Sequence, residues 1–329
     1  MSSRTFDRNG SFSDFLIADH DALHALDDLE SLFDWGSFEK PLSRLYPSHT
    51  GRPSHPLLML FRILILQHLH GVTSDVQMEK MLARDLLFRK FCGLSADSHP
   101  PSHDTISRFR RRLTKAGLWQ DLLETVNAQL AEQHIIIKDG QVSIMDATIV
   151  ECHQVRGKTK DAEAGWCVKK NSRGKEDATY GYKVHSNCDE DGFILKQEVT
   201  AGNVYDGNKR SDLLTGEESQ LYADSVYDSH EGRAELARMG IENRVQRKGC
   251  RYKKLTEEDH QWNKEVGVPR SIIEHQFAEY KERYALRRTR FIGLAINSCH
   301  AGLAAIAHNM KKGLRFFGRY GLPEPTNAG

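Results

Sequence analysis

The distribution of apolar and polar residues divides the chain into a helical first part and a mixed second part. The run Leu57–Leu69 is apolar on nearly every side, which predicts a buried helix. Pro53 and Pro56 precede this run and Gly71 follows it, as expected at helix ends. Ser74 is placed to cap a further helix. These signals predict an all-α N-terminal domain.

The second part is typical of strands that alternate with helices. Residues 141–150 are β-branched and apolar around one carboxylate, which predicts a buried strand. Four more strands are predicted at residues 180–187, 193–200, 219–224 and 241–248. The polar segments 151–179 and 249–263 are interpreted as connections. The pattern therefore predicts an α/β domain with a five-stranded sheet.

Several polar residues stand out in these predicted strands. Asp146 lies within an apolar strand, where an ionised carboxylate is unfavourable unless a metal ion, a lysine or a backbone amide pairs with it. Asp224 ends the fourth strand, and α/β sheets bind their ligands at the carboxyl ends of strands. Asp228 competes for this role, but its place before a predicted helix suits an N-cap better. Lys183 and His185 share one face of the second strand, where His185 also fits the interpretation of a buried structural histidine.

A third carboxylate lies on a predicted helix over residues 269–281, which Pro269 opens at its first turn. Arg270, Glu274 and Lys281 are separated by four and seven residues, which places all three on one helix face. A surface salt-bridge ladder is the alternative interpretation of this spacing. The sequence alone leaves both interpretations open.

A basic helix is predicted after Pro101, with Ser102 or Asp104 at its start. Its apolar stripe leaves a set of arginines for the outer face, namely Arg108, Arg110, Arg111 and Arg112. A short turn before a basic helix is typical of a helix-turn-helix that reads a DNA major groove. A plain surface helix is the alternative.

Composition and charge narrow the class of protein. The chain has 329 residues, 39% of them apolar and 28% charged, which is ordinary for a soluble protein. The net charge is only +1, but four separate basic clusters favour a polyanionic partner. None of the six cysteines shows a two-residue metal or redox spacing, which predicts reduced thiols. With no signal peptide and no run long enough to span a bilayer, we expect a cytoplasmic protein without a membrane partner.

Taken together, the motifs resemble the bacterial DDE transposases of the insertion sequence 5 family over nearly the whole chain. The residues that carry this resemblance are Gly51-Arg-Pro53, Leu87–Leu94, Thr105–Arg110, Asp146-Ala-Thr148, Tyr180–His185, Asn203 with Asp206, Ala223–Tyr227, and Arg270 with Glu274 and Lys281. The resemblance implies a ribonuclease-H-like mixed sheet flanked by helices, preceded by the helical domain. The expected boundaries are residues 1–135 for DNA-end binding or dimerisation, 136–315 for the catalytic domain without a large insertion, and 316–329 for a flexible tail.

The resemblance also implies roles for individual residues. Asp146, Asp224 and Glu274 would be the catalytic triad and would hold two Mg²⁺ ions, for which Mn²⁺ is expected to substitute. Arg270 would orient Glu274 or a phosphate, and Lys281 would contact DNA near the scissile bond. Lys183 and His185 would line the cleft. The arginines of the basic helix would bind DNA. Terminal inverted repeats and target DNA are the implied partners of a homodimer or higher oligomer associated with the bacterial nucleoid.

One position departs from the family pattern, and two other functions stay open. Related transposases place a tyrosine three residues before the arginine, where this chain has Gly267, so a function of that tyrosine is not expected here. A transposase-derived regulator that has lost catalysis is one alternative. A host nuclease of the same fold is the other.

Overall fold

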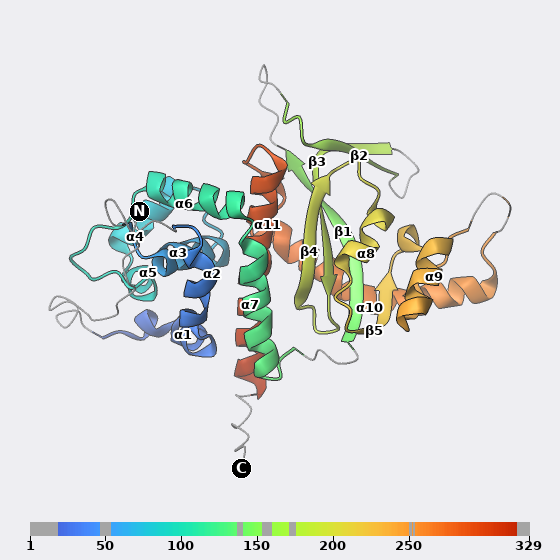
Figure 1. Cartoon of the computed structure of the whole chain (residues 1–329), viewed down its shortest axis with the longest axis horizontal. Helices are drawn as coiled ribbons and strands as arrows, with labels where there is room; N and C mark the ends of the chain where they lie inside the picture. Colours follow the sequence, from blue (N-terminus) through green and yellow to red (C-terminus); the bar gives the residue numbers. More distant parts are fainter. Residues whose placement is uncertain are drawn as a thin grey trace, which may run out of the picture. The chain divides into compact units, whose positions relative to one another are not determined.

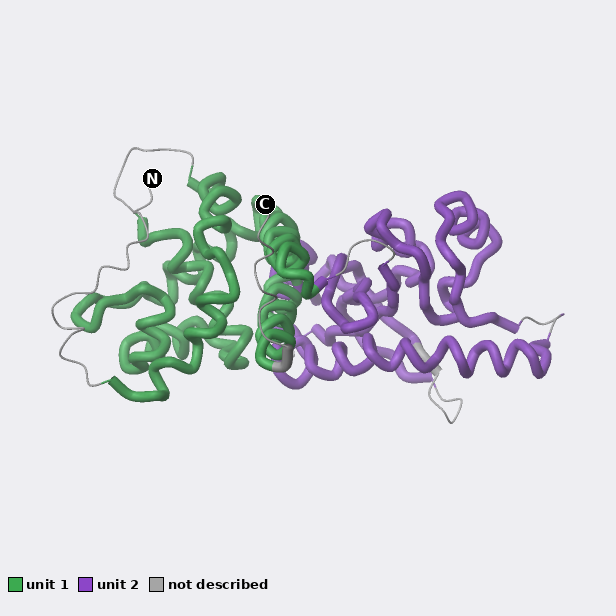
Figure 2. Tube along the Cα trace, turned by 90° about the horizontal axis from the view of Figure 1, so that it is seen from below, with its two compact units in different colours: residues 1–135, 302–329 green, residues 136–301 purple. Residues whose placement is uncertain are grey.

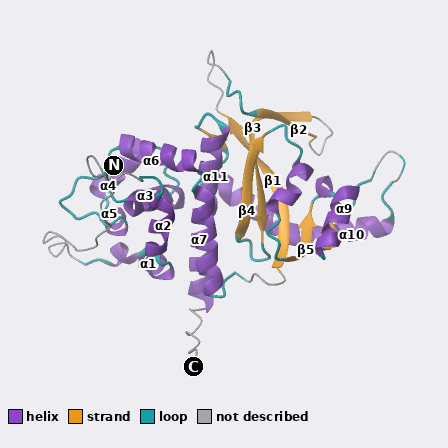
Figure 3. Ribbon diagram, viewed as in Figure 1, coloured by secondary structure: helices purple, strands orange, loops and turns teal. Residues whose placement is uncertain are grey.

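The computed structural model describes residues 19–46, 54–136, 141–152, 160–170, 176–249, 252 and 254–320. The chain divides into two compact units, one of residues 1–135 with 302–329 and one of residues 136–301 (Figure 2). Their described residues form helices in the first unit and a sheet with helices in the second (Figure 3).

The first unit is organised around α3 (Leu57–Leu69), which has the predicted bounds and is buried along nearly its whole length. Arg62 lies in the middle of this helix with 1% exposure, yet it bonds both Glu30 oxygens at 2.7 and 2.8 Å and stacks 4.2 Å from the centroid of Trp35. Its charge is therefore compensated inside the core. The other helices of residues 19–135 are α1 (Asp27–Leu32), α2 (Glu39–Ser43), α4 (Asp75–Arg84), α5 (Leu86–Phe91), α6 (His103–Ala116) and α7 (Trp119–Glu132).

The last helix, α11 (Leu294–Tyr320, labelled in Figure 1), belongs mostly to the first unit. A Cβ atom at Gly302 would lie 2.1 Å from the Trp119 ring, so the glycine permits close packing of α11 on α7. Asn309 also donates a hydrogen bond to Asn127 at 2.7 Å. These contacts explain why residues 302–315 cluster with the first unit, whereas the sequence boundary placed them in the second. The helix also continues past residue 316, where a flexible tail was expected.

Within its described residues, the second unit contains one mixed sheet of seven strands. Antiparallel pairs join β3 to β1, β2 and β4, and parallel pairs join β1 to β5 and β7, and β5 to β6. The strands are β1 (Gln141–Cys152), β2 (Gly165–Lys170), β3 (Glu176–Cys188), β4 (Ile194–Ala201), β5 (Glu218–Ala223), β6 (Glu242–Val245) and β7 (Arg288–Thr289). The predicted fold class is confirmed: the sheet is mixed, flanked by helices and compatible with a ribonuclease-H-like fold. The five predicted strands are present, and β2 and β7 are additional.

The two faces of the sheet have different partners. Met145 of β1 packs in a buried apolar cluster with Leu213 of α8 (Arg210–Leu213) and Leu236 of α9 (His230–Met239). The helix α10 (Glu257–Arg283) crosses β1 and β5, and its Tyr280 hydroxyl donates to the Gln197 side chain at 2.9 Å. Because side chains alternate along a strand, Asp146 points to the opposite face from Met145.

Two predicted connections contain regular structure. The strand β2 lies within segment 151–179 and pairs with β3, and a Cβ at its Gly165 would lie 2.2 Å from the Asn203 side-chain oxygen. The helix α10 begins at Glu257 and not at Pro269, which lies inside it. A capping box at Thr256 and Asp259 satisfies the first amides of this longer helix, so the start predicted at Pro269 was wrong.

This capping box yields the first prediction. The Thr256→Ala substitution should destabilise the start of α10 by about 1 kcal/mol, because the amide of Asp259 loses its acceptor. Hydrogen exchange of the Asp259 and His260 amides should accelerate roughly fivefold. Thr256→Ser retains the hydroxyl and should leave the exchange rates near those of the wild type; equal acceleration in both variants would contradict the assignment.

Candidate active site

The pairing of β1 with β5 brings two of the predicted site residues side by side. The parallel register ends with Met145 opposite Ala223, and the next residues are Asp146 and Asp224. Neighbouring strands lie about 4.8 Å apart, so the two carboxylates start from adjacent backbone positions. Parallel pairing of β1 resumes with β7 at Glu151. Within the described residues, positions 146–150 have no strand partner on this side of β1. Asp146 and Asp224 lie where this unpaired stretch begins.

Asp146 is fixed by its own backbone and by α10. Its Oδ1 accepts from the Ala147 amide at 2.7 Å, and its Oδ2 accepts from Arg270 Nη2 at 3.0 Å. The guanidinium also donates through Nη1 to Gln246 Oε1 at 3.0 Å. Arg270 was expected to orient Glu274 or a phosphate. In the structure, its guanidinium donates to the side chains of Asp146 and Gln246. The reason is the register of α10 on β1, which turns the arginine toward the strand.

Asp224 begins a short 3-10 helix, Ser225–Tyr227, and its carboxylate accepts from the Ser225 amide at 2.5 Å. The Tyr227 ring is buried, and its hydroxyl has no hydrogen-bond partner in the described part of the chain. Burial raises the pKa of this phenol well above its usual value, and the charges of Asp146, Asp206 and Asp224 raise it further. Tyr227 thus lies within electrostatic reach of three carboxylates. Tyr227 belongs to the motif Ala223–Tyr227 that carries the family resemblance, but its residue type alone predicted no role in the site.

Glu274 lies one turn beyond Arg270 on α10 and is exposed. Ile273, Phe277 and Tyr280 are buried, together with Gln276, which agrees with the predicted packing stripe. Lys281 lies two turns further along. In the residues that the structure describes, no group of three His, Cys, Asp or Glu side chains is gathered closely enough to hold a metal ion. The structure therefore brings Asp146 and Asp224 together and leaves Glu274 on the helix that crosses them.

Lys183 and His185 lie on one face of β3, as predicted, but both are buried. Lys183 Nζ donates to Asp206 Oδ1 and to the Val204 carbonyl oxygen, both at 2.8 Å. His185 Nε2 bonds Thr200 Oγ1 at 2.8 Å, while Nδ1 lies 3.8 Å from Asp206 Oδ1 without a hydrogen bond. Burial lowers the pKa of His185 to about 4, although Asp206 opposes this shift. The histidine is therefore neutral at pH 7, and the lysine is bound to a carboxylate.

The basic helix α6 begins at the predicted cap, where Ser102 Oγ accepts from Thr105. Arg108, Arg111 and Arg112 are exposed. Arg110 is 3% exposed and bonds both carboxylate oxygens of Asp75 at 2.6 and 2.7 Å and the Gln67 side chain at 2.7 Å. Its assignment to the outer, DNA-binding face was wrong, because this position belongs to the side of α6 that packs on α3 and α4.

Known families cover both parts of the chain. Residues 137–310 match the family described as "Transposase DDE domain", and residues 13–112 match "Transposase domain (DUF772)". The chain belongs to the DDE transposase family. The first match covers more than half of the sequence and includes β1 with Asp146, the residue Asp224 after β5, and α10 with Glu274.

Solved structures of transposases were also found. A piggyBac transposase synaptic complex with hairpin DNA has 13% sequence identity and a TM-score of 0.42, over 96% of this chain and 84% of that chain. The Mos1 strand transfer complex has 10% identity and a TM-score of 0.19, over 83% of this chain and 81% of that one. No helix among the described residues of this transposase is long and apolar enough to cross a membrane.

DDE transposases generally use divalent metal ions. Asp146 and Asp224 fit such an ion because carboxylate oxygens are the ligands that hard cations prefer, and they sit on adjacent strands. Arg270 supplies a positive charge to Asp146 at the same place. The donor set therefore suits a hard divalent cation better than a soft one.

The buried histidine of this transposase predicts a pH dependence of stability. Its folded pKa of about 4 lies below the ordinary 6.5, so between these values the unfolded chain binds more protons. The unfolding free energy should therefore fall as pH drops from 6.5 to 4, by roughly 2–3 kcal/mol from this group. Urea denaturation across this range should show a shallower dependence for His185→Gln. The same change at exposed His260 is the control, and an equal effect there would refute the assignment.

The buried and the exposed arginines of α6 should contribute differently to the free energy of unfolding. Arg110→Ala should lower the unfolding free energy by about 3 kcal/mol, because it leaves the largely buried Asp75 carboxylate without its guanidinium. Arg111→Ala makes the same change of charge at an exposed position and should cost less than about 0.5 kcal/mol. Parallel chemical denaturation of both variants measures the difference. Similar losses would show that burial of the ion pair does not matter.

Proposed function

We propose that this chain is a transposase of the insertion sequence 5 family, which binds terminal inverted repeats and catalyses metal-dependent DNA strand cleavage and strand transfer. The observation that carries the proposal is the adjacency of Asp146 and Asp224 at the carboxyl end of β5, beneath the helix with Arg270 and Glu274. Family membership supplies the reaction class. The residues at this edge supply the groups that the reaction needs.

Asp146 and Asp224 would hold the divalent ions, and Glu274 would complete the set from α10. When bound, two Mg²⁺ ions activate the attacking oxygen and stabilise the leaving oxygen in phosphodiester transfer, and Mn²⁺ would substitute. Asp146 is held in place for this task by the Ala147 amide and by Arg270. The exposed position of Glu274 leaves its carboxylate free of the protein core.

The DNA would contact positively charged side chains that lie away from Asp146 and Asp224. Arg108, Arg111 and Arg112 present an exposed basic face on α6, which suits phosphate binding. Lys281 lies on the same helix as Glu274 and would contact the strand next to the scissile bond. Lys183 is bound to Asp206 on the face of the sheet opposite Asp146, so we do not assign it a direct DNA contact. Bringing two element ends together requires at least a dimer.

A cleavage assay with matched variants tests the proposal. The Asp146→Asn and Asp224→Asn variants, together with Glu274→Gln, should each reduce Mg²⁺-dependent cleavage of a labelled element end by at least about a thousandfold. Binding of the same DNA should change by less than about threefold, because the phosphate contacts remain. Glu282→Gln alters another exposed carboxylate of α10 and should cleave normally.

The outcome separates the proposal from other functions. Binding of element ends without cleavage by the wild type would indicate a regulator that has lost catalysis. Cleavage that ignores terminal repeats would indicate a host nuclease. Full strand transfer by Asp146→Asn would remove the acid from the mechanism.

A further inference from the structure

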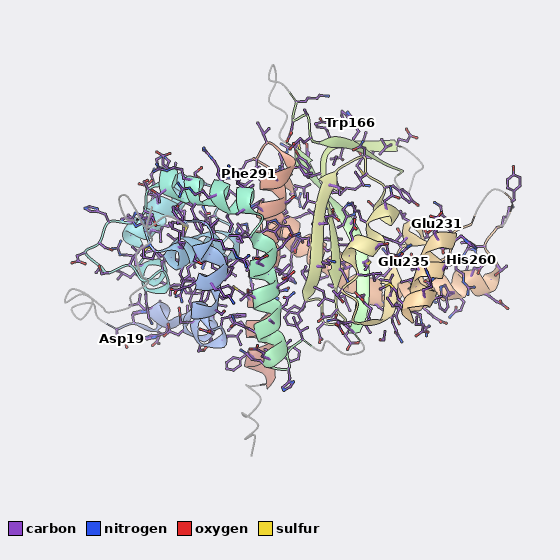
Figure 4. The ribbon with its side chains drawn as sticks, viewed as in Figure 1. Asp19, Trp166, Glu231, Glu235, His260 and Phe291 are labelled. Atoms are coloured by element: carbon purple, nitrogen blue, oxygen red, sulfur yellow. The ribbon has the colours of Figure 1, made fainter. Side chains whose placement is uncertain are left out.

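The upstream part of α10, residues 257–268, is fastened to the chain that leaves β6. His260, labelled in Figure 4, marks this part of the helix. Trp262 Nε1 donates to the Val245 carbonyl oxygen at 3.1 Å. Asn263 bonds both backbone groups of Arg247, with its Oδ1 accepting from the amide at 2.7 Å and its Nδ2 donating to the carbonyl oxygen at 3.0 Å. Two side chains of the helix therefore hold residues 245–247 in a fixed path.

Gln246 lies at the centre of this held segment and is bound at three points. Its backbone amide donates to the Ala223 carbonyl oxygen at 3.0 Å, next to Asp224. Its side-chain Nε2 donates to the Asn263 carbonyl oxygen at 3.0 Å. Its Oε1 accepts from Arg270 Nη1 at 3.0 Å. Both polar ends of the amide are used, which fixes the orientation of the side chain.

Arg270 depends on this contact for its direction. The guanidinium is planar, so a bond that fixes Nη1 also sets the direction of Nη2, which donates to Asp146. The Nε atom is buried and has no hydrogen-bond partner in the described part of the chain. Gln246 and Asp146 are thus the two side-chain partners that define the plane of the guanidinium.

Gly267 leaves room for this arrangement. A Cβ atom at this position would be 3.5 Å from Gln246 Nε2, which is ordinary contact. The absence of a side chain at position 267 is therefore compatible with a glutamine that reaches across to Arg270.

We propose that Gln246 is a positioning residue, which holds Arg270 so that Nη2 of the guanidinium faces Asp146. In the same proposal, residues 257–268 of α10 hold Gln246 in place. The consequence for catalysis rests on the proposed function. The positioning itself does not, because it concerns contacts within the chain. Partners of this kind behind a ligand typically change metal affinity or activity by about 10- to 100-fold when removed.

The direct test is spectroscopic and uses the full chain without DNA or metal. In ¹⁵N NMR, the Arg270 guanidinium of the wild type should give separate Nη signals with slow rotation, assigned by their loss in Arg270→Lys. Gln246→Met has a similar shape but no acceptor oxygen, and these signals should merge. Gln246→Glu restores an acceptor and should keep them separate. Gln261→Met changes a glutamine on the exposed face of the same helix, where it bonds Glu265, and should have no effect.

The second test measures coupling in the cleavage assay. Gln246→Met should lower the cleavage rate about tenfold at unchanged DNA affinity. In an Arg270→Ala background, the same change should add nothing, because a positioning residue acts only through the group that it positions. Gln246→Glu keeps the acceptor for Arg270 but loses the donor to the Asn263 carbonyl oxygen, so it should recover only part of the rate.

The two tests fail in distinguishable ways. Unchanged Arg270 signals in Gln246→Met, or an equal loss of rate with and without Arg270, would overturn the positioning role. Merged signals in Gln246→Met with no cleavage by the wild type would support the positioning role and refute the proposed function alone.

Discussion

The placement of two carboxylates at one point of a sheet is the constraint on which the rest of the second unit depends. The register of β1 with β5 puts Asp146 next to Asp224. Two such charges about 5 Å apart repel by roughly 3 kcal/mol at an effective dielectric near 20. A fold can keep them there only if positive charge or hydrogen-bond donors lie nearby. The Ala147 and Ser225 amides and Arg270 are those groups in this protein.

The helix α10 is the element that meets this requirement. Its central part delivers Arg270 to Asp146, and its upstream part is tied to the chain beyond β6 by Trp262 and Asn263. The helix continues through Pro269 because both sides of the proline are anchored, to β6 upstream and to the sheet downstream. One helix thus connects Asp146 in the middle of β1 and Gln246 at the carboxyl end of β6 through the single guanidinium of Arg270. Glu274 takes its position from the same anchoring.

The opposite face of the sheet carries a second compensated cluster. Lys183 neutralises Asp206, and His185 stays uncharged beside them because burial lowers its pKa. The phenol of Tyr227 lies within reach of Asp206 as well as of Asp146 and Asp224. The charges of all three carboxylates therefore act on this one buried phenol and raise its pKa.

The sequence by itself determined the elements whose pattern is strong and local. The apolar α3, the strand around Asp146, the end of β5 before Asp224 and the Ser102 cap of α6 follow from periodicity and capping. The fold class followed from the alternation of strands and helices. Each of these signals is set by neighbours within a few residues, which is why a single sequence reveals them.

Only the tertiary structure decided which side chains meet. The strand β2 pairs with β3 but leaves its apolar Trp166 and Val168 exposed, so its sequence pattern does not mark a buried face. Arg110 and Arg111 are adjacent in a basic run, and packing alone buries the first. The partner of Arg270 and the contacts of Gln246 join residues up to 124 positions apart. Such contacts depend on strand register and on where each helix packs. The residue types of a local segment do not predict them.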